Sequence, residues 1–111
     1  MTLPNAHLAV VEQREITEYL LNPAHPQNGG KARFFASMGL TDKRWQLMVT
    51  GLSELAKNGQ VVQSSQTAHG RKFIVDGDID APSGNKVRVR SVWIVDQGKD
   101  NPRLVTAYPQ G

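Results

Sequence analysis

The sequence predicts an α+β domain in which three N-terminal helices pack on one face of a roughly four-stranded antiparallel meander sheet. Two observations predict this fold class. Apolar residues recur at helical spacing as far as Asn58, whereas from Gln60 onward their period changes from about 3.6 to about 2 residues. The 111 residues are enough for one apolar core and too few for two, so we expect a single domain, helical over residues 1–59 and β-structured over residues 60–111.

Three helices are expected in the first part of the chain. The first covers residues 12–21 and ends at Asn22-Pro23, because proline cannot continue a helix. The second covers residues 31–38, with Gly39 at its C-terminal end. The third covers residues 41–58, where a capping threonine precedes apolar residues at the i, i+3, i+4, i+7 positions of one helix face.

Four strands separated by turn residues are expected in the second part. The first begins at Val61, and the second covers residues 71–80 and ends at a turn that contains Pro82. The third, over residues 86–96, is the longest, and the last covers residues 103–108. Consecutive strands joined by short turns favour a meander.

Composition limits the classes of function. The formal net charge is +3, which is mildly basic, and Lys86, Arg88 and Arg90 alternate within one predicted strand with no acid between them. Such a strip is able to meet an anionic backbone. Cysteine is absent, which excludes disulfides and thiol chemistry. No apolar run is long enough to span a membrane and no signal sequence is visible, so we expect a cytoplasmic protein without a membrane partner.

Metal, cofactor and nucleotide sites have little support. His7, His25 and His69 are scattered along the chain without the spacing of metal ligands, so no metal and no cofactor are expected. The motifs of acyl hydrolases, dinucleotide-binding folds and P-loops are all absent.

Three aspartates alternate near the end of the second predicted strand. An exposed strand edge is the expected role of Asp76, Asp78 and Asp80, with a divalent-ion site as the alternative.

The stretch NPAHPQNGGKARFF, residues 22–35, is the first candidate site. Its glycine pair leads into the second predicted helix, where free N–H groups together with Lys31 and Arg33 would favour an anion. The alternative is a flexible loop followed by a helix whose lysine is solvated. The residues alone favour this alternative.

The last predicted strand is the second candidate. In a regular strand Leu104, Thr106 and Tyr108 share one face, so a hydroxyl and a phenol lie side by side and are able to hold a phosphate or pass a proton. If the neighbouring strand pairs with it, Arg90 approaches Thr106 or Tyr108. The alternative is that Thr106 is a good strand former and Tyr108 covers the edge of the core.

The third candidate is His69, which precedes Gly70, Arg71 and Lys72. An imidazole with a pKa of about 6.5 beside cations is a credible general base. A histidine in a surface turn is the more common alternative.

The ordered motifs LPNA, YLLNP-x-HP, GKARFFASMGL, RSVWIV and PRLVTAY resemble a family of small uncharacterised bacterial domains that is regarded as a family of toxins. The resemblance covers nearly the whole chain. The order of helices before four strands is also similar to that of the barnase–EndoU–colicin–RelE group of metal-independent ribonucleases. The resemblance implies RNA as substrate and a small cognate antitoxin or immunity protein as partner. The absence of cysteine leaves secretion as a toxin module open, because a cysteine-free toxin functions in any redox compartment.

The resemblance also implies roles for individual residues. His25 would act as base or acid, Lys31 and Arg90 would stabilise negative charge, and Thr106 with Tyr108 would position the scissile phosphate, with Tyr108 as a candidate proton donor. His69 would be a reserve base, although the family often has an aromatic residue at that position. The remaining cations are expected to bind RNA: Arg33, Arg71, Lys72, Lys86 and Arg88. A non-catalytic module that binds nucleic acid or protein through the basic strand is the alternative function, and an antitoxin-like partner is a third.

Overall fold

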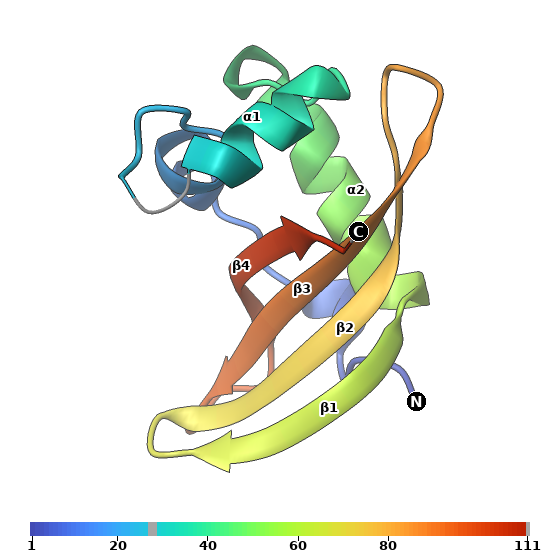
Figure 1. Ribbon diagram of the computed structural model, residues 1–111. Helices are drawn as coiled ribbons and strands as arrows, with labels where there is room; N and C mark the ends of the chain where they lie inside the picture. The colour runs from blue at the N-terminus through green and yellow to red at the C-terminus, as the bar shows by residue number, and fades with distance from the viewer. Residues whose placement is uncertain (27–28, 111) are drawn as a thin grey trace.

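A computed structural model describes residues 1–26 and 29–110 of the chain. Gln27 and Asn28, within the expected loop before the second helix, lie outside the described residues, as does Gly111. The elements follow one another along the chain as helical segments and then strands (Figure 1): η1 (Ala6–Leu8), η2 (Glu15–Leu20), α1 (Gly29–Ser37), η3 (Asp42–Arg44), α2 (Trp45–Asn58), β1 (Gln60–Thr67), β2 (Gly70–Asp80), β3 (Lys86–Asp96) and β4 (Arg103–Pro109).

The four strands form one antiparallel sheet with the order β1-β2-β3-β4, which confirms the predicted meander. The longest ladder joins β2 and β3, from Gly70 opposite Asp96 to Asp80 opposite Lys86. Side chains alternate between the two faces of a strand, so the odd-numbered residues of β3, such as Val89 and Trp93, point into the core.

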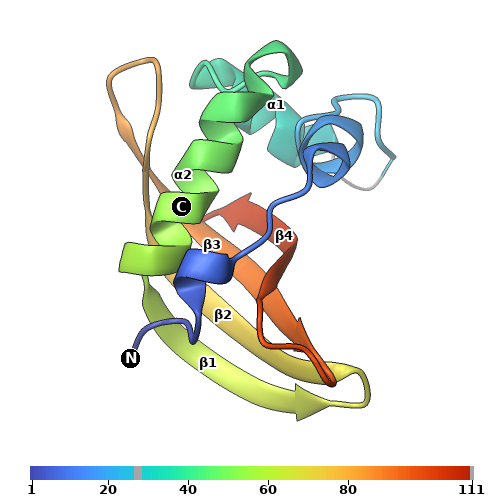
Figure 2. The same ribbon diagram turned by 180° about the vertical axis from the view of Figure 1, so that it is seen from behind.

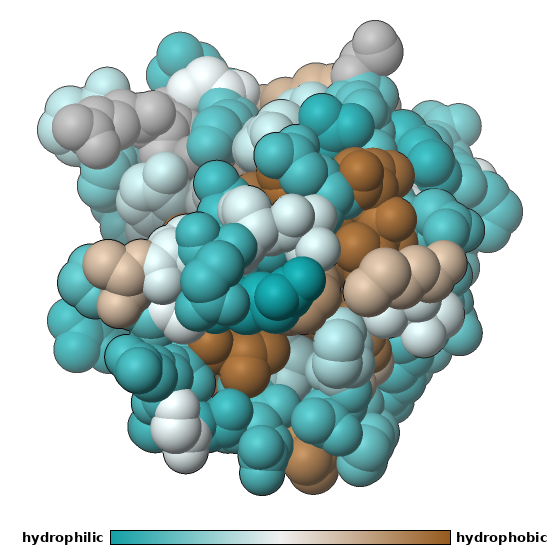
Figure 3. All heavy atoms as spheres, turned by 90° about the horizontal axis from the view of Figure 1, so that it is seen from below, coloured by the Kyte–Doolittle hydropathy of each residue, from teal (hydrophilic) through white to brown (hydrophobic). Residues whose placement is uncertain are grey.

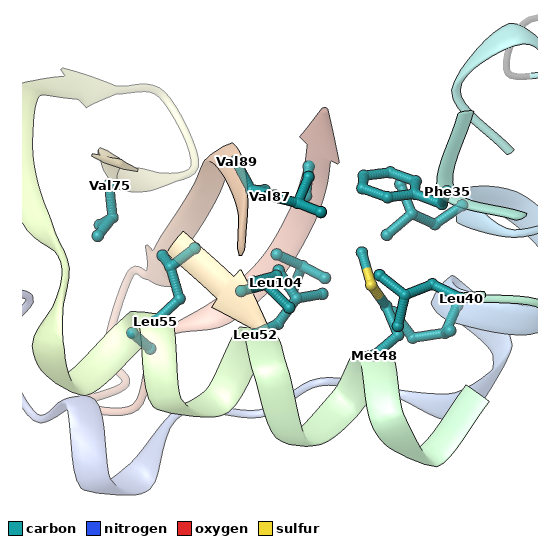
Figure 4. Packing of buried hydrophobic residues seen from close by; sticks show 14 of the residues in the cluster. Phe35, Leu40, Met48, Leu52, Leu55, Val75, Val87, Val89 and Leu104 are labelled. Carbon is teal, nitrogen blue, oxygen red and sulfur yellow. The ribbon is translucent and has the colours of Figure 1, made fainter. Parts of the chain in front are cut away.

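One helix, α2, covers a face of this sheet. Its apolar stripe of Met48, Leu52 and Leu55 is buried and points toward Val75 on β2 and toward the other strands (Figure 4). Figures 1 and 2 together show α2 on this face only, while the opposite face carries no helix. Even-numbered residues of β2 and β3 therefore lie on an open face of the sheet.

The expectation of three N-terminal helices packed on the sheet is wrong. Two α-helices, α1 and α2, precede the strands, and α1 contacts the edge strand β4 instead of lying across the sheet. Within residues 12–21, residues 13 and 14 are α-helical and lead into the six-residue π-helix η2, and the N–H of Leu21 donates to the carbonyl of Ile16 at 2.8 Å. This wide turn lets Ile16, Leu20 and Leu21 all point into the core before Pro23 ends the segment.

A β-bulge changes the faces of β4. Leu104 pairs with Trp93, but Thr106 pairs with Val92, so Val105 is the extra residue. Leu104 is consequently on the core face, whereas Thr106 and Tyr108 are on the open face. The predicted sharing of one face by Leu104 and Thr106 is therefore wrong, while that of Thr106 and Tyr108 is confirmed.

In the direction of view of Figure 3 the surface is mostly hydrophilic, with brown side chains in several places. No helix in the described part of the chain is long and apolar enough to cross a membrane.

Candidate functional site

The open face of the sheet contains a partly buried ion pair. Arg90 on β3 lies directly opposite Asp76 on β2, and its Nε and Nη2 donate to the two carboxylate oxygens at 2.8 Å each. The side chain of Asp76 is only 6% exposed, and that of Arg90 is 32% exposed. The hydrogen bond from Arg90 is the main reason why the pKa of Asp76 lies below its ordinary value.

Two residues from the end of the chain complete the surroundings of this pair. The side-chain amide of Gln110, oriented to satisfy both partners, donates to Asp76 Oδ2 at 3.2 Å and accepts from Arg90 Nη2 at 2.8 Å. Tyr108 is the partner of Arg90 on β4. Asp76 and, to a smaller extent, Tyr108 raise the pKa of Arg90, so its guanidinium stays charged.

Helix α1 brings a second cation to the same place. The ammonium of Lys31 lies 5.3 Å from the centroid of the Tyr108 ring and 5.9 Å from that of the Tyr19 ring in η2. Both distances are within the range of a cation–π interaction, so two phenol rings position the half-buried lysine. Lys31 occupies this position because Ala32 and Phe35 are buried and so fix the orientation of α1 against the core.

His25 joins this group through Tyr19. Their rings meet edge to face with centroids 4.9 Å apart, and the backbone N–H of His25 donates to the carbonyl of Asn22 at 3.2 Å. Asn22 also forms an Asx turn, in which its side-chain oxygen accepts from the N–H of Ala24 at 3.0 Å. These bonds shape the loop that holds the imidazole beside η2.

We call this group the β4-edge cluster: His25, Tyr19, Lys31, Tyr108, Arg90, Asp76 and Gln110. It gathers side chains from η2, the loop after η2, helix α1, strands β2, β3 and β4, and the residue that follows β4. An ammonium and a guanidinium here flank a phenol, which is a combination suited to a phosphate group.

Thr106 lies two residues before Tyr108 on the same open face. Its hydroxyl oxygen is buried and has no hydrogen-bond partner among the described residues. A buried hydroxyl without a partner costs free energy, so the side chain would gain from any acceptor or donor that reached it. The structure therefore places Thr106 beside the cluster but without a bond to it.

Sequence reasoning named four members of the cluster and missed the other three. Tyr19 was interpreted only as part of the apolar face of a helix, and no motif pointed to Gln110. Asp76 was interpreted together with Asp78 and Asp80. The alternation of aspartates on one strand with cations on the next was visible, but only the register makes them partners.

Other predicted cations lie elsewhere or face carboxylates. Lys86 donates to Asp80 at 2.8 Å, and Arg88 lies 3.6 Å from Asp78. The basic strip is thus matched by an acidic one, which lowers the positive potential that nucleic acid would meet. Arg33 is exposed and follows Lys31 by two residues, about 200° around α1, so it points away from the cluster.

The third candidate lies at the opposite end of the sheet. His69 is exposed in the turn between β1 and β2, and Arg71 and Lys72 follow at the start of β2. At about 3.3 Å per residue, Gly70 is about 20 Å along the strand from Asp76. The structure therefore does not bring His69, Arg71 or Lys72 to the cluster.

No group of three or more acidic or histidine side chains able to hold a metal ion occurs within residues 1–26 and 29–110. The three aspartates of β2 are instead divided between Arg90, Arg88 and Lys86.

Known proteins resemble this chain over nearly its whole length. Among solved structures, a chain of the contact-dependent growth inhibition toxin–immunity protein complex from Klebsiella pneumoniae 342 superimposes with a TM-score of 0.75. The match covers 96% of this chain and 97% of the other at 15% sequence identity, which shows a shared fold. No curated protein matches the chain. The model of one family matches residues 2–111, and the chain therefore belongs to the family described as a domain of unknown function, DUF6883.

Proposed function

We propose that this protein is a metal-independent ribonuclease toxin and that the β4-edge cluster is its active site. The observation that supports this most is the position of Lys31, whose ammonium lies 5.3 Å from the ring of Tyr108 while Arg90 is the cross-strand neighbour of that tyrosine. Two cations and a phenol from distant parts of the sequence thus converge on one surface.

In the proposed reaction the 2′-hydroxyl of RNA attacks the adjacent phosphorus. A base removes the hydroxyl proton, the P–O bond to the 5′-oxygen breaks, and an acid protonates that oxygen. The products are a 2′,3′-cyclic phosphate and a free 5′-hydroxyl. Because RNA supplies its own nucleophile, the chemistry needs no metal-bound water.

The cations have the electrostatic role in this scheme. Lys31 and Arg90 stabilise the negative charge that grows on the phosphoryl oxygens in the transition state. Asp76 and Gln110 occupy Nε and Nη2 of Arg90, which leaves Nη1 as the nitrogen engaged by neither. Asp76 and Gln110 act as positioning residues, because their hydrogen bonds fix the guanidinium of Arg90, whose cross-strand partner is Tyr108.

Proton transfer is assigned to the remaining groups. His25 is the proposed base or acid, and Tyr108 is the candidate proton donor, with Thr106 helping to position the phosphate. His69 has no part in this site because it lies at the other end of β2.

The structural neighbour supports the toxin part of the proposal. It belongs to a complex that contains a growth inhibition toxin and an immunity protein. By analogy we propose that a cognate antitoxin or immunity protein neutralises this protein. That complex contains both a toxin and an immunity protein, so a test must distinguish the two roles for this chain. Expression of the chain alone in bacteria does so: growth arrest supports the role of toxin, and tolerated expression contradicts it.

The direct test uses RNA and DNA of the same sequence. We expect cleavage of RNA only, with cyclic phosphate ends detected by mass spectrometry and with unchanged activity in excess chelator. Cleavage of DNA, loss of activity with chelator, or intact RNA would each contradict the proposal.

A pair of lysine variants tests the site. Lys31→Ala should reduce cleavage by about 100-fold or more, because a charge-stabilising group in the transition state is lost. Lys43→Ala removes the same charge from an exposed position in η3 and should retain full activity. Both variants should show the circular dichroism of the parent protein, and equal activity in the two would rule out the assigned role of Lys31.

A further inference from the structure

Strand β2 extends beyond its neighbour β1. β1 begins at Gln60 opposite Asp76, whereas the pairing of β2 with β3 continues to Asp80 opposite Lys86. No strand of the described chain lies beside residues 77–80 on the β1 side. This part of β2 is therefore a free sheet edge.

The backbone groups at this edge point outward. Ala81 N–H donates to the carbonyl of Asn85 at 2.9 Å, and bonding to β3 alternates along an antiparallel pair. Ile79 is accordingly bonded to Val87, while Asp78 and Asp80 direct their N–H and C=O groups away from β3. Asp76 obeys the same alternation, and it pairs on that side with Gln60. The backbone groups of Asp78 and Asp80 therefore point to the same side as those of Asp76, but beyond the start of β1.

A groove of about 460 Å³ runs between this edge and α2. One wall of the groove is a stripe of α2 residues at helical spacing: Leu47, Thr50, Gly51 and Glu54. The other wall is formed by residues 78–82. These include residues from both faces of β2, so the groove runs along the edge of the strand. Leu47 is 45% exposed there, although it is a large apolar side chain.

The charge of the groove has one sign. Its lining contains Glu54, Asp78 and Asp80 and no basic residue. Lys86 and Arg88 meet Asp80 and Asp78 from β3, on the far side of the strand from the groove. A partner at this edge would therefore gain from lysine or arginine on its outward side and from apolar residues toward α2.

We propose that this groove binds an extended segment of a protein partner, which adds to β2 as a further strand and alternates apolar with basic residues. Its backbone satisfies the N–H and C=O groups of Asp78 and Asp80, its apolar side chains contact Leu47, and its basic side chains face the carboxylates. The inference does not depend on the ribonuclease proposal, because no residue of the β4-edge cluster lines the groove, even though Asp76 precedes Asp78 by two residues on β2.

A second copy of this chain is a poorer occupant. Pairing β2 with β2 of another copy would bring Asp78 and Asp80 of both copies together, and like charges directly opposite are destabilising. Within the described chain no other strand is available to pair with residues 77–80, because β4 lies at the other edge of the sheet.

The test uses the acetylated and amidated peptide Lys-Val-Lys-Val-Lys and a form of it in which the backbone nitrogens of all five residues are methylated. We expect the first to bind with a dissociation constant below about 1 mM and to slow amide exchange at Asp78 and Asp80 in heteronuclear spectra. The methylated form keeps the charges of its side chains, but none of its five residues can donate a backbone hydrogen bond to Asp78 or Asp80, so it should not bind. Equal binding of both peptides, or of neither, would overturn the proposal.

Three protein variants locate the site. Glu54→Lys and Leu47→Arg should each weaken the peptide at least tenfold, because they add positive charge to the groove. Val62→Arg adds one positive charge, as Leu47→Arg does, at an exposed apolar position on β1 outside the groove, and should bind within twofold of the parent. An equal loss in all three variants, or sedimentation showing a dimer that the peptide dissociates, would contradict the assignment.

Discussion

Ser91 shows how one hydroxyl can hold two parts of the core together. Its Oγ donates to the carbonyl of Val75 at 2.8 Å and accepts from Trp93 Nε1 at 2.8 Å, and it is completely buried. The indole of Trp93 is also fully buried, so it has no access to water as a substitute partner. Ser91 therefore lets the sheet bury its largest side chain without an unsatisfied N–H.

Ser91→Ala should lower the free energy of unfolding by about 1–3 kcal/mol, because Trp93 Nε1 and the Val75 carbonyl would lose their buried partner. Urea denaturation followed by tryptophan fluorescence measures the loss. Ser83→Ala, at an exposed position of the β2–β3 turn, should change stability by less than about 0.5 kcal/mol. Equal stability of the parent and Ser91→Ala would show that the indole finds another acceptor.

The pair of Asp76 and Arg90 should make stability depend on pH. Since the pKa of Asp76 is lower in the folded state than its ordinary value, its contribution is fully present above about pH 4–5 and is lost as the pH falls through the folded-state pKa. We expect Asp76→Asn to be less stable than the parent at pH 7, with the difference shrinking below about pH 4. Denaturation curves at several pH values measure it.

The matched control for that experiment is Asp100→Asn. Asp100 is exposed and has no ion pair among the described residues. Its replacement should give a small difference from the parent that does not vary with pH. A difference for Asp76→Asn that stays constant down to pH 3 would mean that the ionised carboxylate is not what stabilises the pair.

At the scale of elements, the contact of α2 with β2 depends on a glycine inside the helix. A Cβ at Gly51 would lie 2.6 Å from Ile79 Cγ2, closer than such atoms approach. Glycine normally weakens a helix, but here its missing side chain lets α2 approach the sheet and set the width of the groove.

The same substitution should therefore have opposite effects in the two helices. Gly51→Ala should destabilise the protein by about 1–3 kcal/mol through overpacking against Ile79. Gly30→Ala, in α1 where a Cβ would meet nothing within 4 Å, should stabilise it by about 0.5–1 kcal/mol. Thermal and urea denaturation compare the two, and a loss of similar size at both positions would contradict the packing argument.

The strands were the most predictable elements. The bounds expected for β3 agree with the structure, and those of β2 and β4 differ by one residue at an end, because alternation and turn residues mark strands directly. The bulge at Val105 was not predictable, since an extra residue leaves the composition of RLVTAYP unchanged. The segment 12–21 was expected to be an α-helix because its apolar spacing does not distinguish α from π turns.

At the scale of the whole molecule, the candidate site was predictable in its parts but not in its assembly. Lys31, Arg90 and Tyr108 were named from motifs, and the structure puts the three together. Lys86 and Arg88 form ion pairs with aspartates of β2, so their charges are offset. This pairing depends on the strand register, which one sequence does not determine. The same is true of Tyr19, which becomes relevant only because η2 lies against α1.

The contact between Lys31 and Tyr108 also has a consequence for synthesis of the protein. The ribosome makes Lys31 before Tyr108 and Gln110, so a nascent chain first carries the ammonium without the phenol and the amide. Translation must reach β4 before these groups are able to meet. The order of synthesis therefore makes the cluster a late product of folding, assembled only once β4 has joined the sheet.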